Sequence, residues 1–154
     1  MALIQWDEIF TTGIAQVDAD HRHLFDLINQ VHEAFATQDL MQVGAVLDQL
    51  VDYSCYHFTT EEAWMWSVGY PKVTEHMRQH DGFARRVTEM QRNYAAGKTA
   101  ALTSEVLTFV RNWWVTHILE SDGKFRRFVD AANEGLAAGP LSSGNGGGPH
   151  PDVA

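Results

Sequence analysis

The 154-residue chain contains a single cysteine, Cys55, and only four prolines. With one cysteine, no disulfide can form within the chain, and neither a cysteine-rich zinc site nor an iron–sulfur cluster can be built. The chain also lacks apolar runs of the roughly 20 residues that a membrane-spanning helix needs. Its N-terminus does not combine a basic segment with an apolar one, as a secretory signal would. We therefore expect a cytoplasmic protein without a membrane partner.

Basic residues are also few. The sequence has 11 Lys and Arg against 20 Asp and Glu, so its net charge is −9 at neutral pH. Such a charge keeps a protein soluble and repels the phosphates of nucleic acids. We therefore expect no nucleic-acid partner, and we expect the protein to be a monomer.

Turn-forming residues are concentrated at a few positions, and each segment between those positions has the pattern of a helix. The breaks lie at residues 37–39, 69–71 and 96–98, and from Gly139 onward. Four segments have core-facing positions at spacings of three and four, namely 21–35, 43–64, 76–94 and 102–117. Short connections make neighbouring helices antiparallel. The sequence therefore predicts an all-α, up-and-down, antiparallel four-helix bundle.

Both ends of the chain differ from the bundle. Residues 1–17 carry several large apolar side chains, including Trp6 and Phe10, and we expect them to pack across the bundle as an N-terminal arm. The bundle domain is predicted to span residues 1–136. Residues 137–154 have the glycine-rich and proline-rich composition of a flexible tail.

Histidines and acidic residues occupy positions that the helical pattern assigns to the core. An unpaired polar group there costs about 1 to 3 kcal/mol, so something inside the bundle must bind these side chains. His57 and Glu61 lie four residues apart, as do His76 and His80, so each pair projects from one face of a helix. This spacing is typical of chelating residues.

Five histidines also lie at similar distances along the helices from the turns near residues 38 and 97. At about 1.5 Å of rise per residue, all five fall in one layer roughly 6 Å thick. These candidate ligands are His21, His57, His76, His80 and His117. Such an alignment is rarely produced by chance, so the sequence predicts a metal site near one end of the bundle.

Asp122 is a further candidate ligand only if the fourth helix is distorted. It follows His117 by five residues, and at about 100° per residue it would point about 140° away from that histidine on a regular helix. Gly123 beside it makes a distortion easier. We therefore predict a break or bulge between His117 and Asp122.

Together these residues offer five imidazole nitrogens and two carboxylates. Each carboxylate can bridge two metal ions through its two oxygens. With one bridging hydroxide, a pair of six-coordinate ions would keep one position free for a small ligand such as dioxygen. Imidazole suits iron, copper, nickel and zinc, so ligand type alone does not select the metal. A carboxylate-bridged six-coordinate pair favours iron over tetrahedral zinc.

The order of the candidate ligands resembles that of the bacterial hemerythrins. After His21 come HxxxE at 57–61, HxxxH at 76–80 and HxxxxD at 117–122, and the resemblance extends from Trp6 to about residue 130. It implies two iron ions joined by an oxo or hydroxo bridge, reversible dioxygen binding, and a reductant that the sequence does not identify.

The resemblance also implies how the ligands divide. Three histidines would bind the coordinatively full iron, namely His76, His80 and His117. His21 and His57 would bind the iron with the open position, and Glu61 and Asp122 would bridge the two ions.

Trp114 departs from the family pattern, in which leucine is common at this position beside the oxygen pocket. Trp113 takes the place of the usual tryptophan. Because Trp114 lies three residues before His117, its indole would share a face with that ligand and line or partly fill the pocket.

Three functions stay open on this sequence. The first is a non-enzymatic oxygen carrier, store, delivery module or sensor, and the second is a di-iron peroxidase or nitric-oxide-processing enzyme. The third is a metal-free bundle with incidental histidines. Ferritin-like di-iron bundles use mostly glutamates, so the histidine-rich ligand set favours reversible binding over oxygenation.

Several polar residues near the candidate ligands are expected to play no part in the site. Asp20 is expected to cap the first helix or to carry a surface charge. Glu62 is rotated by about 100° from Glu61 and is expected to face solvent. We interpret His23 as a surface residue and His150 as part of the tail.

Overall fold

A computed structural model describes residues 1–138. The first two residues of the predicted 137–154 tail, Ala137 and Ala138, belong to the last helix, and the rest of the tail, with His150, lies outside the described residues. The helical elements are η1 (Glu8–Phe10), α1 (Ala15–Ala36), α2 (Leu40–Ser67), α3 (Val73–Ala95), η2 (Thr99–Ala101), α4 (Ser104–Thr116), η3 (His117–Asp122) and α5 (Gly123–Ala138). The described residues contain no strand, so the predicted all-α class is confirmed. No helix in this part of the chain has the length and apolarity needed to cross a bilayer.

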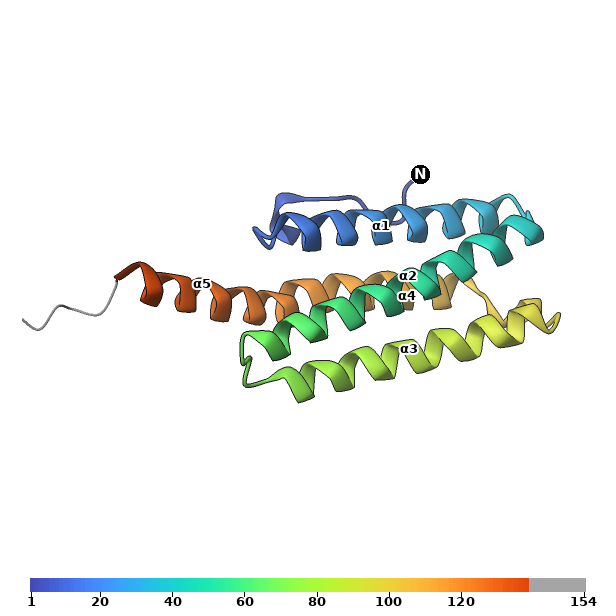
Figure 1. Ribbon diagram of the computed structural model, residues 1–154. Coiled ribbons are helices and arrows are strands. Elements are labelled where there is room, and N and C mark those ends of the chain that lie inside the picture. The colour runs from blue at the N-terminus through green and yellow to red at the C-terminus, as the bar shows by residue number, and fades with distance from the viewer. Residues whose placement is uncertain (139–154) are drawn as a thin grey trace, which may run out of the picture.

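Four helical rods run up and down the bundle, and the fourth is built from α4, the π-helical η3 and α5 in succession (Figure 1). The connections fall at the predicted breaks. Each contains a residue in the left-handed region, with φ of 59° at Gln38, 68° at Gly69 and 87° at Gly97. Glycine adopts this conformation without steric penalty, so two of the three tight reversals follow directly from sequence.

The helices α2 and α4 begin at side-chain caps. The Asp39 side chain accepts a hydrogen bond from the Gln42 backbone N–H at the start of α2. Thr103 does the same for the Val106 N–H at the start of α4. Each of these caps satisfies a backbone donor that the first helical turn leaves free.

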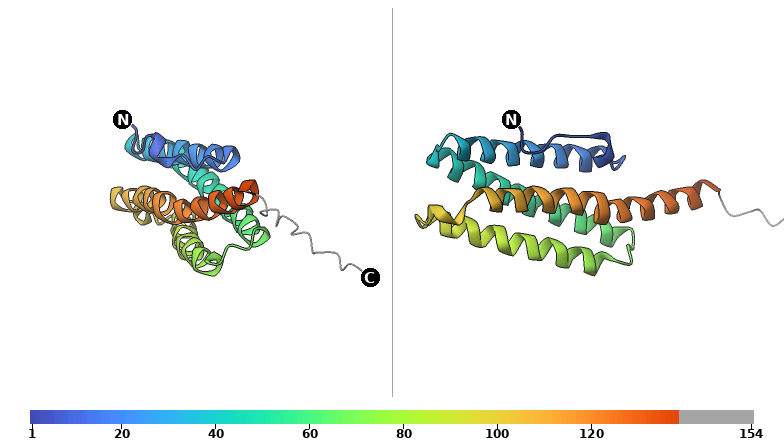
Figure 2. Two further views of the ribbon diagram at one scale, coloured as in Figure 1. Left: turned by 90° about the vertical axis from the view of Figure 1, so that its left-hand side faces the viewer. Right: turned by 180° about the vertical axis from the view of Figure 1, so that it is seen from behind.

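The N-terminal arm lies along the bundle beside α1, as Figure 2 shows from behind. Its Ile4 and Phe10 side chains are buried. The Asn29 amide exchanges two hydrogen bonds with the backbone of Ile4, of 3.0 and 2.8 Å, and Arg111 Nε donates to the Leu3 carbonyl at 2.9 Å. The arm therefore packs across the bundle, as predicted, and it links α1 to α4, although Ile9 within it is exposed.

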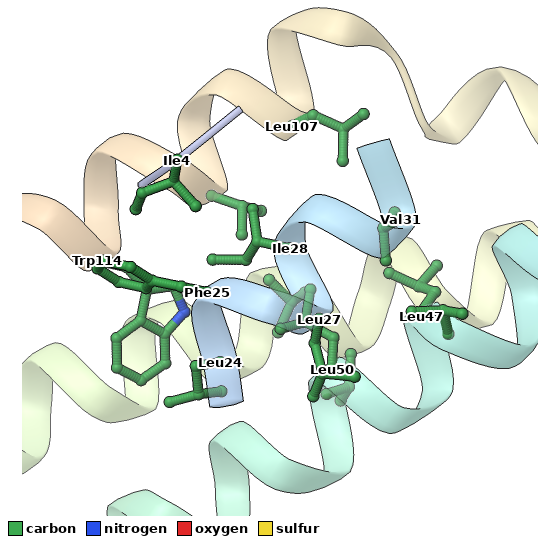
Figure 3. Packing of buried hydrophobic residues seen from close by; sticks show 14 of the residues in the cluster. Ile4, Leu24, Phe25, Leu27, Ile28, Val31, Leu47, Leu50, Leu107 and Trp114 are labelled. Atoms are coloured by element: carbon green, nitrogen blue, oxygen red, sulfur yellow. The ribbon is translucent and has the colours of Figure 1, made fainter. Parts of the chain in front are cut away.

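The apolar core fills the space between the rods along most of their length. Figure 3 shows part of it, with Leu24, Ile28 and Val31 from α1 packed among residues of the other helices. Trp114 belongs to the same cluster and is completely buried. The core and the layer of candidate ligands are therefore continuous, because Trp114 contacts both of them.

Removing a side chain from this core should destabilise the protein. We expect Leu47→Ala to lower the free energy of unfolding by about 2 to 5 kcal/mol, because the truncated side chain leaves a cavity. Leu47 is 1% exposed, whereas Leu40 is 57% exposed. Leu40→Ala is therefore the matched control and should change stability by less than about 0.5 kcal/mol. Urea unfolding measures both, and equal losses would contradict this core.

Candidate metal centre

The seven predicted ligand residues meet inside the bundle, and none is more than 4% exposed. They form two groups in which the donor atoms lie within 4.8 Å of one another. The first group is Glu61, His76, His80, His117 and Asp122, and the second is His21, His57 and Glu61. Each of the four rods contributes at least one residue, so the site exists only when the whole bundle is assembled.

The fourth rod contributes two of these residues through an irregular turn. Residues His117–Asp122 form a π-helix between the α-helices α4 and α5. A π turn is wider than an α turn and accommodates one additional residue. As a result His117 Nε2 and Asp122 Oδ1 lie 3.2 Å apart, and the predicted bulge is confirmed.

Both carboxylates lie between the two groups of histidines. Glu61 places Oε1 2.7 Å from His76 Nε2 and Oε2 3.2 Å from His57 Nε2. Asp122 places Oδ1 3.2 Å from His76 Nε2 and Oδ2 3.2 Å from His21 Nε2. Each carboxylate therefore turns one oxygen toward each group, which is the arrangement that a bridging ligand requires.

The comparisons with known proteins agree with this geometry. The family profile described as "Hemerythrin HHE cation binding domain" matches residues 12–129. The chain belongs to the hemerythrin family. A crystal structure of wild-type hemerythrin shares the fold, with a TM-score of 0.78 and 32% identity over 82% of this chain and 97% of that chain. A leucine-to-tyrosine variant of hemerythrin gives a TM-score of 0.79 and 33% identity over the same shares.

Similar sequences include two bacteriohemerythrins. The protein of Stenotrophomonas maltophilia (strain R551-3) is 34% identical over 131 residues, covering 85% of this chain and 84% of the relative. The protein of Methylococcus capsulatus (strain ATCC 33009 / NCIMB 11132 / Bath) is 34% identical over 123 residues, covering 79% and 93%.

Three of the candidate ligand histidines have a hydrogen-bond partner at Nδ1, the ring nitrogen on the outer side of the site. His57 Nδ1 lies 3.0 Å from Asp20 Oδ2, and His80 Nδ1 lies 2.8 Å from Glu62 Oε1. An acceptor on Nδ1 keeps the proton there and leaves Nε2 free to bind a metal ion. Both partners therefore turn their histidine toward the centre of the site.

The third outer partner is Gln79, whose Oε1 lies 3.0 Å from His117 Nδ1. The Ser121 hydroxyl donates to the same oxygen at 2.6 Å. Because an amide oxygen only accepts, His117 Nδ1 must donate the hydrogen bond. The Nε2 atom of His117 is then free on the inner side.

Two of these partners correct the sequence analysis. Asp20 does not cap α1, which begins at Ala15, and it is 3% exposed behind His57. The side chain of Glu62 is 18% exposed and bonded to His80, so it is not simply solvated. Gln79 was not predicted at all.

A shared position in the sequence could have identified these three partners. Each lies beside a candidate ligand, with Asp20 next to His21, Glu62 next to Glu61, and Gln79 next to His80. A step of about 100° turns the neighbouring side chain from the site toward the adjacent helix. A polar residue beside a buried ligand is therefore a candidate support for a ligand on the next helix.

Buried charge governs the electrostatics of the site. Burial lowers the pKa of His57, but hydrogen bonds to Asp20 and Glu61 outweigh it and raise the pKa to about 10. Burial likewise lowers the pKa of His76, but the neighbouring carboxylates of Asp122 and Glu61 outweigh it and raise the pKa to about 9. Without a metal, protons on these imidazoles balance the two carboxylates, so metal binding would replace those protons.

Behind the site, burial raises the pKa of Asp20, but hydrogen bonds with His57, Tyr53 and Gln16 outweigh it and bring the pKa to about 2. Asp20 is therefore an anion at neutral pH. Burial lowers the pKa of His80 to about 3, so this imidazole is neutral, as a metal ligand must be.

Two further observations test whether metal ions fit here. Both oxygens of Asp122 are buried without a hydrogen bond, although imidazole nitrogens surround them. In addition, His21 and His57 face each other with Nε2 atoms 3.1 Å apart, as do those of His80 and His117 at 3.0 Å. Converging imidazole nitrogens and buried carboxylate oxygens need positive charge between them, from protons or from metal ions, so the donor set fits a pair of metal ions.

The two tryptophans of α4 lie on different parts of the site. The Trp113 ring stacks on His117 at a centroid distance of 4.5 Å. The Trp114 ring lies 6.2 Å from that of His21 and 6.1 Å from that of His57, and its Nε1 has no hydrogen-bond partner. The Trp114 ring also lies 6.3 Å from that of His117, so its indole borders both groups of histidines.

The π-helical turn can be tested by deleting one exposed residue from it. Without Glu120, Asp122 would follow His117 by four residues, and a regular α-helix would keep both on one face. We expect this deletion to retain bound iron. Deleting Asn112 from the regular turns of α4 should abolish iron binding, because the part of the rod after the deletion is then rotated by about 100° relative to the part before it.

Iron analysis and circular dichroism of both purified deletion variants measure the outcome. Loss of iron from the Glu120 deletion, in a chain that stays helical, would contradict the role assigned to the π turn.

Proposed function

We propose that this hemerythrin-family chain binds dioxygen reversibly at two iron ions, without catalytic turnover. The proposal rests above all on the two carboxylates, each of which turns one oxygen toward each group of histidines. The ligands would be His21, His57, Glu61, His76, His80, His117 and Asp122, with an oxo or hydroxo bridge completing the pair. Bound iron would supply the electrons that reversible dioxygen binding requires.

The unequal number of histidines supports an open coordination position on the ion beside His21 and His57. Three imidazoles surround one end of the carboxylate pair, whereas only His21 and His57 surround the other. The second ion would therefore have fewer protein ligands and room for an external one. An apolar pocket of about 330 Å³ reaches this side of the site and is lined in part by Val17, His57 and Glu61.

The surrounding side chains limit the access of water to this position. Phe58 stacks on His80 at 3.9 Å between ring centroids and on Trp114 at 5.3 Å. An apolar shell disfavours the escape of charged products and controls solvent access to a metal site. These rings would therefore favour release of neutral dioxygen over irreversible oxidation.

The ligand chemistry supports binding over oxygenation. Five neutral imidazoles and two carboxylates carry less negative charge than the glutamate-rich sites of ferritin-like bundles. Less negative charge favours the reduced pair of ions. A peroxidase or nitric-oxide-processing activity at the same position is the alternative, and multiple-turnover consumption of peroxide would distinguish it. Cytoplasmic location, a monomeric state and an unidentified reductant stay predictions of the sequence.

The proposed function can be tested by an oxygenation cycle. Anaerobically reduced protein with about two irons per chain should develop a charge-transfer band in air and lose it when oxygen is removed. Iron analysis and absorption spectra over repeated cycles measure this. Oxidation that does not reverse would refute reversible binding, and absence of iron would refute the di-iron site.

Truncating single ligands should reduce the iron content to different extents. His57→Ala should bring it below two per chain, and Glu61→Ala should lower it further because Glu61 belongs to both groups. His23→Ala, at an exposed position of α1, is the control and should keep two irons. Elemental analysis of the reconstituted proteins provides the measurement. Two irons and a reversible adduct in either ligand variant would contradict the assignment.

Shortening Trp114 should open the space beside His21 and His57. We expect Trp114→Leu to retain two irons and to bind and release dioxygen faster, because a smaller side chain leaves room at the open position. Because the smaller side chain leaves a cavity, the substitution should lower the free energy of unfolding by about 3 kcal/mol. Stopped-flow absorption measures both rates. Unchanged rates in a folded, iron-loaded variant would show that the indole does not restrict the pocket.

A further inference from the structure

The carboxylate behind His57 is held in one orientation by three hydrogen bonds. Its Oδ1 accepts from the Tyr53 hydroxyl at 2.8 Å and from the Gln16 amide at 2.8 Å. Its Oδ2 is thereby directed at His57 Nδ1, 3.0 Å away. Asp20 itself is 3% exposed, so water screens its charge little.

The three outer partners of the site are not equivalent. His117 has a neutral amide, that of Gln79, and the partner of His80 is Glu62, whose side chain is 18% exposed. Only His57 has a carboxylate that is both buried and fixed by two further donors. The strongest anionic partner therefore belongs to the group with two histidines, where the open position is proposed.

We propose that Asp20 is a positioning residue that strengthens His57 as an electron donor and lowers the reduction potential of the iron on the open side. Tyr53 moderates this effect by drawing negative charge toward Oδ1. The inference rests on the proposed function, because it concerns the iron ion that His57 would bind.

The physical basis is the hydrogen bond between a carboxylate and the outer nitrogen of a metal-binding imidazole. The anion pulls the Nδ1 proton toward itself and so increases the electron density at Nε2, which stabilises the more highly charged ion. A donor on the same carboxylate withdraws part of that density. Asp20 and Tyr53 should therefore shift the potential in opposite directions.

Two conservative variants test this difference in sign. Asp20→Asn keeps the shape of the side chain but removes its charge, so the reduction potential of the iron-loaded protein should rise. Tyr53→Phe removes one donor while Gln16 still holds the carboxylate, so the potential should fall. Anaerobic redox titration followed by absorption measures both shifts, and slower autoxidation of Asp20→Asn than of Tyr53→Phe should accompany them.

The matched controls carry the same changes at exposed positions of the same helices. Asp26→Asn on α1 and Tyr56→Phe on α2 should leave the potential unchanged. Simple loosening of the site by both test variants would move their potentials in the same direction. Shifts of the same sign, or no shift in either variant, would overturn the inference.

A further measurement isolates the positioning role. In the reduced iron-loaded protein, the His57 Nδ1 proton should exchange slowly with solvent, and Asp20→Ala should accelerate that exchange and weaken iron binding about 10- to 100-fold. Proton NMR in H₂O and D₂O follows the exchange, with Asp26→Ala as control. Unchanged exchange and affinity in Asp20→Ala would oppose the role.

Iron content and reversible oxygenation of the unsubstituted protein are recorded first, which separates the two proposals. If the protein binds two irons and oxygen reversibly but the two variants do not shift the potential in opposite directions, the proposed function stands and the proposed role of Asp20 is wrong. If the protein takes up no iron, both proposals are wrong.

Discussion

The structure depends on the burial of two carboxylates, Glu61 and Asp122, among five imidazoles in the interior of the bundle. Buried charge without compensation is strongly destabilising, so positive charge must be present there as protons or as metal ions. Protons shared with His57 and His76 supply it in the absence of metal. Much of the remaining architecture holds donor atoms on four separate rods at the distances that this compensation needs.

The fold and the inner donors could be predicted from sequence because both follow a helical period. The breaks near Gln38, Gly69 and Gly97 delimit the rods, and the spacing of core positions selects the faces that turn inward. Even the bulge before Asp122 was predictable, since a regular helix cannot bring that residue to the face of His117. These constraints act within one helix or turn, so they can be predicted from the sequence alone.

Sequence position marks Asp20, Glu62 and Gln79 as polar residues beside buried ligands, but it does not give the histidine that each one contacts, because that depends on distances between helices. Asp20 was assigned to a helix end, yet α1 begins five residues earlier and Asp20 contacts His57, 37 positions away. Glu62 and Gln79 also act across a helix boundary. Helical period gives the direction of a side chain but not the identity of the atom that it meets.

These cross-helix contacts also limit how far the site could be simplified. α1 supports a histidine of α2, α2 supports one of α3, and α3 supports one in η3. Each of the first three rods thus supplies a ligand of its own and the outer partner for its neighbour. A peptide made of any two helices would present imidazoles that have lost their orientation, so the smallest transplantable unit for protein design is the complete bundle.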